Sequence, residues 1–257
     1  MSQAVRTLRA LHLGRAAGDP LVLPGPWDAA SARAFEAAGF PALATPSAGI
    51  ARSLGYEDGS TPADEMFAQV ARIVRAVSVP VTADLEGGYG LAPKELVGRI
   101  LETGAVGVNL EDSDGPRGLK DAHEHAEWLA AVRAEAGHAL FVNARVDVYL
   151  HAGPESESGS EPGSAASAAL ERARLYAAAG ADCVYPILAP VTDLPALRAG
   201  LGDALPLNAL AGKGGPPFAE LGRLGATRIT FGPGLLLRTL DHVSALAEAL
   251  AEESRGA

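Results

Sequence analysis

A repeated pattern of helix end and strand start restricts this chain to few architectures. Four segments, AAGFPALA, ETGAVGV, AAGADCV and RLGATRI, each place a glycine after a helix-length stretch and directly before an apolar run. Glycine is favoured just past the C-terminal end of a helix because it adopts a left-handed backbone at little steric cost. Each segment therefore predicts a helix that ends and a strand that begins, which is half of a β/α repeat.

Short apolar runs alternate with helix-length segments eight times along the 257 residues. We expect the strands around Leu21, Ala42, Val81, Val106, Phe141, Val184, Leu207 and Ile229. We expect helices over residues 29–38, 62–77, 93–102 and 123–136, from about residue 164, and over residues 233–253. The runs are almost continuously apolar, as strands covered on both faces are. Because no Gly-x-Gly-x-x-Gly follows the first strand, the sequence predicts one (β/α)8 TIM-type barrel over residues 1–257 rather than a doubly wound sheet.

Composition and charge exclude several classes of function. The formal charge of -10 at pH 7 is unfavourable for binding a phosphate backbone, so we expect no nucleic-acid partner. No apolar run approaches ~18 residues, and MSQAVRTLRALHLGR is too charged for a signal peptide, so we expect a cytoplasmic protein without membrane association. Cys183 is the only cysteine, which excludes an internal disulfide. Residues 153–167, rich in Gly, Ser and Glu, are expected to form a flexible loop after the fifth strand.

Acidic residues follow the expected third and fourth strands. Asp84 and Glu86 end the third strand and Glu111 ends the fourth, and the carboxyl ends of barrel strands are where active sites lie. Two apart on an extended segment, Asp84 and Glu86 are expected to point to the same side. Carboxylates sharing one small volume repel one another unless a cation compensates them, and all-oxygen ligands suit Mg²⁺ or Mn²⁺. Each acid taken alone is also explained as a cap of the following helix.

Two further features at the expected strand ends suit anions. Arg145 closes an otherwise apolar fifth strand, so its guanidinium needs either a neighbouring acid such as Asp147 or a substrate carboxylate held by two hydrogen bonds. We favour the substrate contact. Ser47, Ala48 and Gly49 follow the second strand and offer a hydroxyl with successive backbone N–H groups, which can hold an anionic group. A plain tight turn explains that triplet equally well.

The segments ADLEGGYG, VNLED and NARVD resemble the isocitrate lyase and phosphoenolpyruvate mutase superfamily, and the similarity extends over nearly the whole chain. The resemblance implies a (β/α)8 barrel, dependence on Mg²⁺, and chemistry on small 2-oxo or 2-hydroxy acids through an enolate-type intermediate. It also implies a homodimer or homotetramer in which the last barrel helix is exchanged between subunits. The segment from residue 233 to residue 253 has an apolar face long enough for that role, although packing on its own barrel explains it too.

The resemblance also implies roles for individual residues. Asp84 would be the principal acid at the metal, with Glu86 and Glu111 orienting water around it, and Asp58 in LGYEDG would lie near metal and substrate. Arg145 would contact the reacting end of the substrate. The substrate carboxylate would bind Ser47, Ala48 and Gly49. As further substrate contacts we expect residues at the ends of the first, third and seventh strands, Trp27, Tyr89 and Asn208.

The sequence departs from the well-known subgroups of this superfamily in the loop after the fourth strand. Cleaving members carry a Lys-Lys/Arg-Cys-Gly-His segment there, whereas residues 111–121 of this chain contain no cysteine and no histidine. Lys120 is present, but the asparagine that mutases carry on this loop has no clear counterpart, and Tyr185 stands where mutases show a histidine. The proton donor is therefore left open among Lys120, Tyr89 and water.

We accordingly expect a metal-dependent lyase-type enzyme that cleaves a C–C or C–P bond beside the carbonyl or hydroxyl of its substrate. A phosphoenolpyruvate mutase-like or phosphonopyruvate hydrolase-like activity is one alternative, and a catalytically inactive barrel that binds metal and 2-oxo acid is another. A Schiff-base aldolase is disfavoured because it needs a lysine on a barrel strand. The three lysines, Lys94, Lys120 and Lys213, fall in expected helices or loops.

Overall fold

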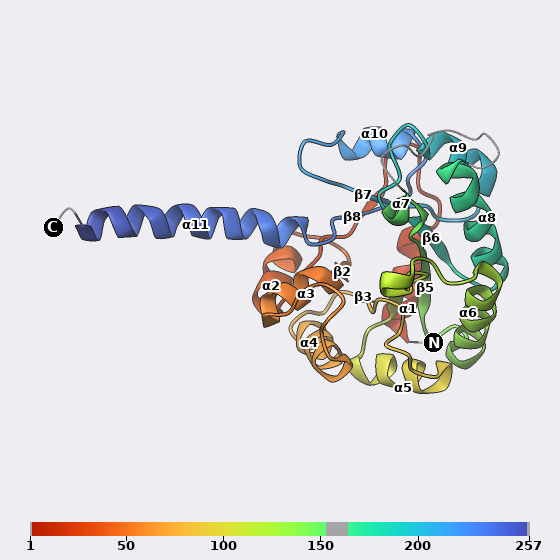
Figure 1. Cartoon of the computed structure of the whole chain (residues 1–257), viewed down its shortest axis with the longest axis horizontal. Helices are drawn as coiled ribbons and strands as arrows, with labels where there is room; N and C mark the ends of the chain where they lie inside the picture. The colour runs from red at the N-terminus through yellow and green to blue at the C-terminus, as the bar shows by residue number, and fades with distance from the viewer. Residues whose placement is uncertain (1, 153–163, 256–257) are drawn as a thin grey trace.

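The protein is built from parallel strands that alternate with helices, as the sequence predicts (Figure 1). The structure, a computed structural model, describes residues 2–152 and 164–255. The strands are β1 (Leu21–Val22), β2 (Leu43–Thr45), β3 (Val81–Asp84), β4 (Gly107–Glu111), β5 (Phe141–Val146), β6 (Cys183–Pro186), β7 (Asn208–Leu210) and β8 (Arg228–Thr230). Every expected strand is confirmed in place.

The strands form two parallel sheets that two further contacts join into a ring. One sheet has the order β2-β3-β4-β5-β6 and the other the order β1-β8-β7. A parallel bridge between Val184 and Leu207 links β6 to the start of β7. At the other seam, the backbone N–H of Ala44 on β2 donates to the carbonyl of Pro24, just after β1, at 3.1 Å. The strand order is therefore consistent with a TIM-type barrel.

Helices surround the strands and alternate with them along the chain (Figure 1). They are α1 (Gln3–His12), α2 (Ala29–Ala37), α3 (Ser47–Leu54), α4 (Ala63–Arg75), α5 (Pro93–Thr103), η1 (Gly115–Arg117), α6 (Ala122–Ala136), α7 (Val148–His151), α8 (Ala165–Ala178), α9 (Leu194–Leu201), α10 (Phe218–Arg223) and α11 (Gly234–Arg255). The four glycines of the repeated pattern have left-handed backbones after α2, α5, α8 and α10, with φ of 90°, 83°, 99° and 114°. The pattern thus marks helix ends as expected.

One local expectation is wrong, and one of the alternatives left open is excluded. Residues 164–167 are not part of a loop, because the hydroxyl of Ser164 accepts the N–H of Ser167 at 3.1 Å and starts α8. The remainder of that expected loop, residues 153–163, lies outside the described residues. The triplet that begins at Ser47 is not a tight turn but the first turn of α3, a helix that the sequence did not lead us to expect.

The apolar interior has two layers, one outside the barrel and one inside it. The larger layer lies between the strands and the surrounding helices. The smaller layer fills the amino-terminal end of the barrel, where Val5 and Leu8 of α1 pack with Leu21, Phe141 and other strand residues. Gly107 on β4 permits this close approach, since a Cβ there would stand 2.8 Å from Oγ1 of Thr82 and 3.0 Å from Leu8. Helix α1 therefore closes the end of the barrel opposite the carboxyl ends of the strands.

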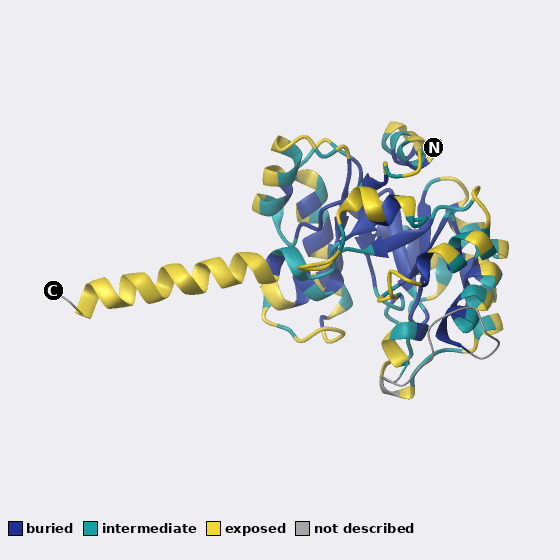
Figure 2. Ribbon diagram, turned by 90° about the horizontal axis from the view of Figure 1, so that it is seen from above, coloured by how far each residue is buried: buried dark blue, intermediate teal, exposed yellow. Residues whose placement is uncertain are grey.

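Helix α11 projects away from the barrel (Figures 1 and 2). Within it only Leu236 is buried. Five large apolar side chains are exposed on it, Leu237, Leu240, Val243, Leu246 and Leu250. This helix does not pack along its own barrel, which excludes the self-packing alternative in this structure, while exchange between subunits stays a prediction. None of the described helices combines the length and apolar character needed to cross a membrane.

Candidate active site

The parallel register brings polar side chains of neighbouring strands into two layers inside the barrel. One layer aligns Asp84 of β3 with Asn109 of β4 and Asn143 of β5. The next layer, closer to the carboxyl ends, aligns Glu111 of β4 with Arg145 of β5. Successive side chains on a strand alternate between faces, so residues two apart, such as Asn109 and Glu111, share the inner face. The short strands thereby place acids, amides and one arginine at the opening of the barrel formed by the carboxyl ends of its strands, which we call the mouth.

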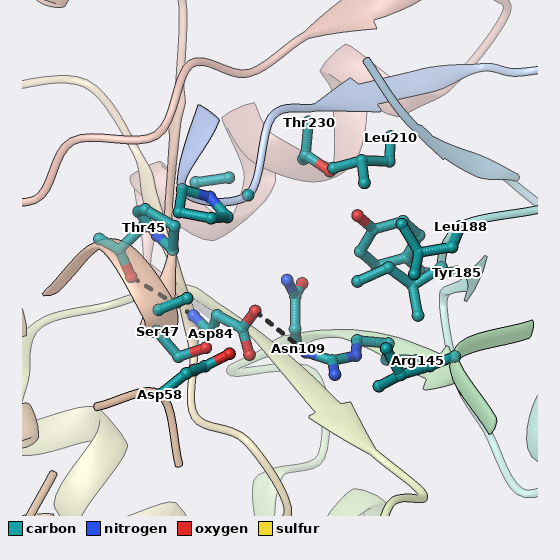
Figure 3. Close-up of a pocket in the computed structure, with 17 residues that line it drawn as sticks. Thr45, Ser47, Asp58, Asp84, Asn109, Arg145, Tyr185, Leu188, Leu210 and Thr230 are labelled. Carbon is teal, nitrogen blue, oxygen red and sulfur yellow. Dashed lines mark hydrogen bonds and ion pairs between the residues drawn. The ribbon is translucent and has the colours of Figure 1, made fainter. Parts of the chain in front are cut away.

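A cavity of about 190 Å³ opens at the carboxyl ends of the strands. Its lining comes from β2, β3, β4, β5, β6, β7 and β8 and from the loops that follow some of them. Figure 3 shows Ser47, Asp58 and Asp84 at one side of this cavity, with Asn109 and Arg145 reaching toward them. The cavity therefore lies at the end of the barrel where the active sites of (β/α)8 enzymes are found.

Arg145 is the electrostatic centre of the mouth. Its Nε and Nη2 donate to the two carboxylate oxygens of Asp147 at 2.7 and 2.8 Å. Its Nη1 lies 2.7 Å from Oε2 of Glu111 and 3.7 Å from Oδ2 of Asp84. Burial alone would lower the pKa of Arg145, but the Asp147 hydrogen bonds and the charges of Asp84 and Glu111 outweigh it and raise that pKa. Of the two partners considered for Arg145, the structure shows the neighbouring acid, Asp147. Arg145 also lines the cavity, where a substrate could contact it.

Burial disfavours the charged forms of the acids at the mouth. Burial raises the pKa of Asp84, against the opposing charge of Arg145. Burial raises the pKa of Glu111 to about 8, with Arg145 opposing and the other acids adding to the rise. Burial and the charges of Asp84 and Asp58 raise the pKa of Glu86 to about 7. Raised pKa values of several neighbouring carboxyls indicate that the site lacks enough positive charge to stabilise all of their ionised forms.

Glu86 does not continue the third strand. Strand β3 ends at Asp84, and Glu86 has a left-handed backbone with φ of 52°, so the expected extended geometry is wrong. The turn nevertheless returns Glu86 to the mouth, where its N–H donates to Oδ1 of Asp84 at 3.3 Å. A non-glycine residue with positive φ costs about 1–3 kcal/mol and is tolerated mainly where function requires it. The three predicted acids therefore lie at the same end of the barrel, although Glu86 arrives there by a turn that the sequence pattern did not indicate.

A second cavity adjoins the first and contains the other acids. Glu86 and Glu111 line it together with His151, and Ser47, Asp58 and Arg145 line both cavities. One carboxylate oxygen of Glu86, Oε1, is buried and makes no hydrogen bond of standard geometry among the described residues, although the hydroxyl of Tyr89 lies beside this carboxylate. A buried carboxylate oxygen that accepts no hydrogen bond is a suitable ligand for a hard cation or for water bound to one.

The donor set fits Mg²⁺ or Mn²⁺ held mainly through water. Across the residues that the structure describes, no three His, Cys, Asp or Glu side chains converge closely enough to enclose a bare ion. Mg²⁺ commonly keeps several waters and binds only one or two carboxylates together with its substrate, so a compact cluster of three ligands is not required. Asp84 lines the first cavity and can supply the direct carboxylate, while Glu86 and Glu111 line the adjoining second cavity.

The first turn of α3 lies on the same side of the cavity as Asp84. Ser47 and Ala48 line the cavity, whereas Gly49 is buried against Pro46. Pro46 precedes the helix without a side-chain cap, so the first N–H groups of α3 remain available to an anion. Asp58 lies on the loop after α3 and lines both cavities.

The remaining predicted site residues stand outside the two cavities. Trp27 packs edge-on against Phe35, and Tyr89 packs against Phe67. Asn208 is buried and donates to Oγ1 of Thr230, which itself lines the cavity. The structure therefore places these three outside the lining, although the hydroxyl of Tyr89 still interacts with Glu86, which lines the second cavity.

Lys120 is also turned away from the acids. Its ammonium donates to the backbone carbonyl of Glu111 at 3.1 Å and lies over the ring of Trp128. It borders a separate hollow with Gly87 and His125. Burial lowers the pKa of Lys120, but the side chain does not reach the cavity that Asp84 and Arg145 line.

The sequence reasoning missed an amide and arginine network below the cavity. Asn109 lines the cavity, and its Oδ1 accepts from Asn143 at 2.9 Å and from Arg228 at 3.2 Å. Two donors on Oδ1 leave the amide N–H groups of Asn109 free to face the cavity. The signal was present, because Asn109 and Asn143 each stand two residues before a predicted site residue and so share its face.

A second missed feature is a chain of hydrogen bonds that leads outward from Arg145. Ser113 donates to Oδ2 of Asp147 at 2.5 Å and lies 3.0 Å from Nε2 of His151. His151 lines the second cavity beside Glu86 and Glu111. It belongs to α7, beyond the end of β5, which is why a search restricted to strand ends did not find it.

Comparisons with known proteins agree with this geometry. The family model for phosphoenolpyruvate phosphomutase matches residues 8–251. An uncharacterized protein of Mycobacterium tuberculosis is 32% identical over 84% of this chain and 78% of its own length. A probable 2-methylisocitrate lyase of Corynebacterium glutamicum is 30% identical over 77% of this chain, which spans only 63% of that relative.

Solved structures show the same relationship. A putative phosphonomutase from Burkholderia cenocepacia has 38% identity and a TM-score of 0.85, covering 96% of this chain and 98% of its own. The structure of 2,3-dimethylmalate lyase, described as a PEP mutase/isocitrate lyase superfamily member, has 25% identity and a TM-score of 0.80 over 99% of this chain and 89% of its own. This chain belongs to the PEP mutase/isocitrate lyase superfamily and is an enzyme of the lyase and phosphomutase type.

Proposed function

We propose that this chain is a Mg²⁺- or Mn²⁺-dependent lyase-type enzyme that cleaves a C–C or C–P bond next to the carbonyl or hydroxyl of a small 2-oxo or 2-hydroxy acid through an enolate. The observation that carries the proposal is the position of Arg145, which lines both cavities beside the start of α3 and lies 3.7 Å from Asp84 of the first cavity and 2.7 Å from Glu111 of the second. Acids with raised pKa values beside one arginine suit a cation together with an anionic substrate.

Each wall of the cavity has a distinct task in this proposal. Asp84 would hold the ion, with Glu86 and Glu111 accepting hydrogen bonds from water around it. The bound ion supplies Lewis acidity toward the oxygens of a 2-oxo acid. The hydroxyl of Ser47 and the free N–H groups of α3 would bind the substrate carboxylate. Nη1 of Arg145 would donate to the oxygen on which charge develops.

The proton that completes the reaction has a better candidate in His151 than in Lys120 or Tyr89. His151 lines the second cavity, whereas the other two side chains stand outside both cavities. Imidazole is a group that gives and takes protons near neutral pH. Through Ser113, His151 also connects to Asp147, which positions Arg145.

Cleavage of a C–C bond is favoured over phosphoryl transfer between carbon and oxygen. A putative phosphonomutase is among the similar structures, so mutase or phosphonate chemistry is the second candidate. A phosphonate carries charge that needs cationic partners, and Arg145 is the one cationic side chain among the described residues that line the main cavity. Since Arg145 already contacts three carboxylates, the cavity suits a substrate with less charge.

We also propose that the enzyme is a homodimer or homotetramer in which α11 packs on a neighbouring subunit. Its exposed apolar side chains, from Leu237 to Leu250, lie on a helix that projects from the barrel (Figure 2). An apolar helix face of this length without a packing partner marks a protein–protein contact.

Calorimetry with oxalate, which mimics an enolate of a 2-oxo acid, tests the proposal. Oxalate is expected to bind the wild-type enzyme only when Mg²⁺ or Mn²⁺ is present, and Asp84→Ala is expected to lose this binding. Asp64→Ala is the matched control, because Asp64 is an exposed acid on α4 bonded to Arg99. A wild-type affinity in Asp84→Ala, or metal-independent binding, would refute the assignment. A screen of 2-oxo, malate-type and phosphonate compounds for metal-dependent turnover then separates cleavage of C–C bonds from cleavage of C–P bonds.

A further inference from the structure

The main cavity has two chemically different ends (Figure 3). At one end lie the polar groups already assigned to metal and carboxylate binding, including Ser47 and Asp84. At the other end Figure 3 shows Leu188, Leu210 and Tyr185, on the far side of Asn109 from Asp84. Leu150 and Ile187 are the other large aliphatic residues of the lining, and Leu150 borders the second cavity as well. We call the four aliphatic residues, Leu150, Ile187, Leu188 and Leu210, the apolar wall.

Leu188 is the most informative member of the apolar wall. Its φ of 60° places a leucine in the left-handed region, where a side chain is sterically disfavoured. Leu188 lines the cavity and is 48% exposed to solvent overall, and Leu150, which also lines it, is 47% exposed. Two features lower the stability of the folded protein here: the strained backbone of Leu188 and the exposure of large apolar side chains to water. Such an arrangement is retained where it contacts a ligand.

Among the described residues, this end of the cavity offers the hydroxyls of Tyr185 and Thr230 but no cationic side chain for a second anionic group. Arg145 is the cation of the cavity, and Asp147, Glu111 and Asp84 already surround it. A carboxylate or phosphonate placed against Leu188 and Leu210 would lose its hydration without gaining a charged hydrogen bond, which is strongly unfavourable. An aliphatic group placed there would remove apolar surface from water on both sides.

We infer that the substrate is a 2-oxo or 2-hydroxy acid whose far end is an uncharged aliphatic tail, with the tail packed on the apolar wall. This inference rests on the proposed function, because the polar end must hold the acid group for the tail to reach Leu188. It narrows the substrate class to acids with a single anionic group and makes Leu188 a specificity-determining residue.

Competition against oxalate in the presence of Mg²⁺ tests the inference with unreactive or slowly reacting probes. Affinity is expected to rise about fourfold per added methylene from 2-oxobutanoate to 2-oxopentanoate, the value of one buried methylene. 2-Oxoglutarate, which has the same chain as 2-oxopentanoate but ends in a carboxylate, is expected to bind at least tenfold more weakly. Equal or tighter binding of 2-oxoglutarate would overturn the inference.

Two substitutions at Leu188 separate specificity from folding. Leu188→Gly suits the left-handed backbone, so it should fold at least as well as the wild type while it loses the gain per methylene. Leu188→Lys should favour 2-oxoglutarate over 2-oxopentanoate. Leu101→Lys, which changes a leucine of similar exposure on α5, is the control and should leave the preference unchanged.

Oxalate binding to the wild-type enzyme shows whether a negative result refutes the proposed function or only the inference about the aliphatic tail. If oxalate shows no Mg²⁺-dependent binding to the wild-type enzyme, the proposed function fails and the inference fails with it. If oxalate binds as expected but tail length has no effect, or Leu188→Gly retains the full gain per methylene, only the inference about the tail is refuted.

Discussion

Replacing each of two buried arginines by methionine is expected to change stability in different ways. Arg145 contacts three carboxylates, whereas Arg228 is fully buried and lies within ion-pair distance of no carboxylate among the described residues. Methionine keeps an unbranched apolar side chain of comparable length at both positions. The pair therefore separates the effect of losing a buried cation from the effect of losing its partners.

Arg145→Met leaves Asp84, Glu111 and Asp147 without their cation. Removing one partner of a buried ion pair costs about 3–5 kcal/mol of unfolding free energy, because the remaining charge stays buried. The loss should be largest near pH 8. Without Arg145 the pKa values of the acids rise further, the folded state binds more protons than the unfolded state, and stability falls as pH increases. Near pH 5.5 the acids take up protons, so the loss should be smaller there.

Arg228→Met removes a charge whose burial is poorly compensated. Nη2 donates to Asn109, while Nε and Nη1 find no acceptor among the described residues. Burial lowers the pKa of Arg228, in the direction expected when the charged form is unfavourable. Replacing poorly paired buried charge by an apolar side chain is commonly neutral or stabilising, so the unfolding free energy should stay within about 1 kcal/mol of the wild type or rise.

Urea denaturation followed by tryptophan fluorescence measures both variants. The reasoning about Arg145 is refuted if Arg145→Met loses less than about 1 kcal/mol near pH 8, or loses the same amount at both pH values. A loss in Arg228→Met as large as that in Arg145→Met would show that Arg228 has compensating partners that the geometry does not reveal.

Three other predictions follow from the structure. His125 is buried, and burial lowers its pKa to about 3. Between pH 7 and pH 5 the unfolded chain therefore binds a proton at this residue that the folded protein does not, which destabilises the wild type. In urea titrations His125→Phe should lose about 2 kcal/mol less unfolding free energy over this range than the wild type. Tyr176 donates to buried Asp112 at 2.7 Å, so Tyr176→Phe should cost about 1–3 kcal/mol and lower the melting temperature in calorimetry. Leu246→Glu on α11 should reduce the particle mass in light scattering if that helix joins subunits.

The strands and helix ends were predictable because local chemistry determines them. A glycine such as Gly104 or Gly180 ends a helix through its own backbone freedom, whatever packs around it. Once the strands are parallel, the register follows, and the positions of Glu111 and Arg145 on one face follow from alternation along each strand. The meeting of acids and arginine at one mouth could therefore be expected from sequence.

Side chains on turns could not be placed in the same way. Glu86 reaches the mouth only because its backbone turns into the left-handed region, and no residue spacing indicates that turn. Lys120 points toward Trp128 rather than the acids because α6 supplies an aromatic ring beside it. Trp27 stands behind the lining because Phe35 of α2 packs against it. In each case a tertiary contact decides the direction of the side chain.

Arg228 shows how stability and site geometry compete inside this barrel. Its burial is unfavourable, yet with Asn143 it holds Oδ1 of Asn109 and so directs the amide N–H groups of Asn109 toward the cavity. A neutral donor held in a fixed direction stabilises developing charge without moving during the reaction. The positive charge of Arg228 also interacts with Asp84 and so favours its ionised form, which a metal requires. Arg228 thus lowers stability while it orients the amide of Asn109. Such a residue is expected at an active site, because its role in function explains why a more stable apolar residue does not occupy the position.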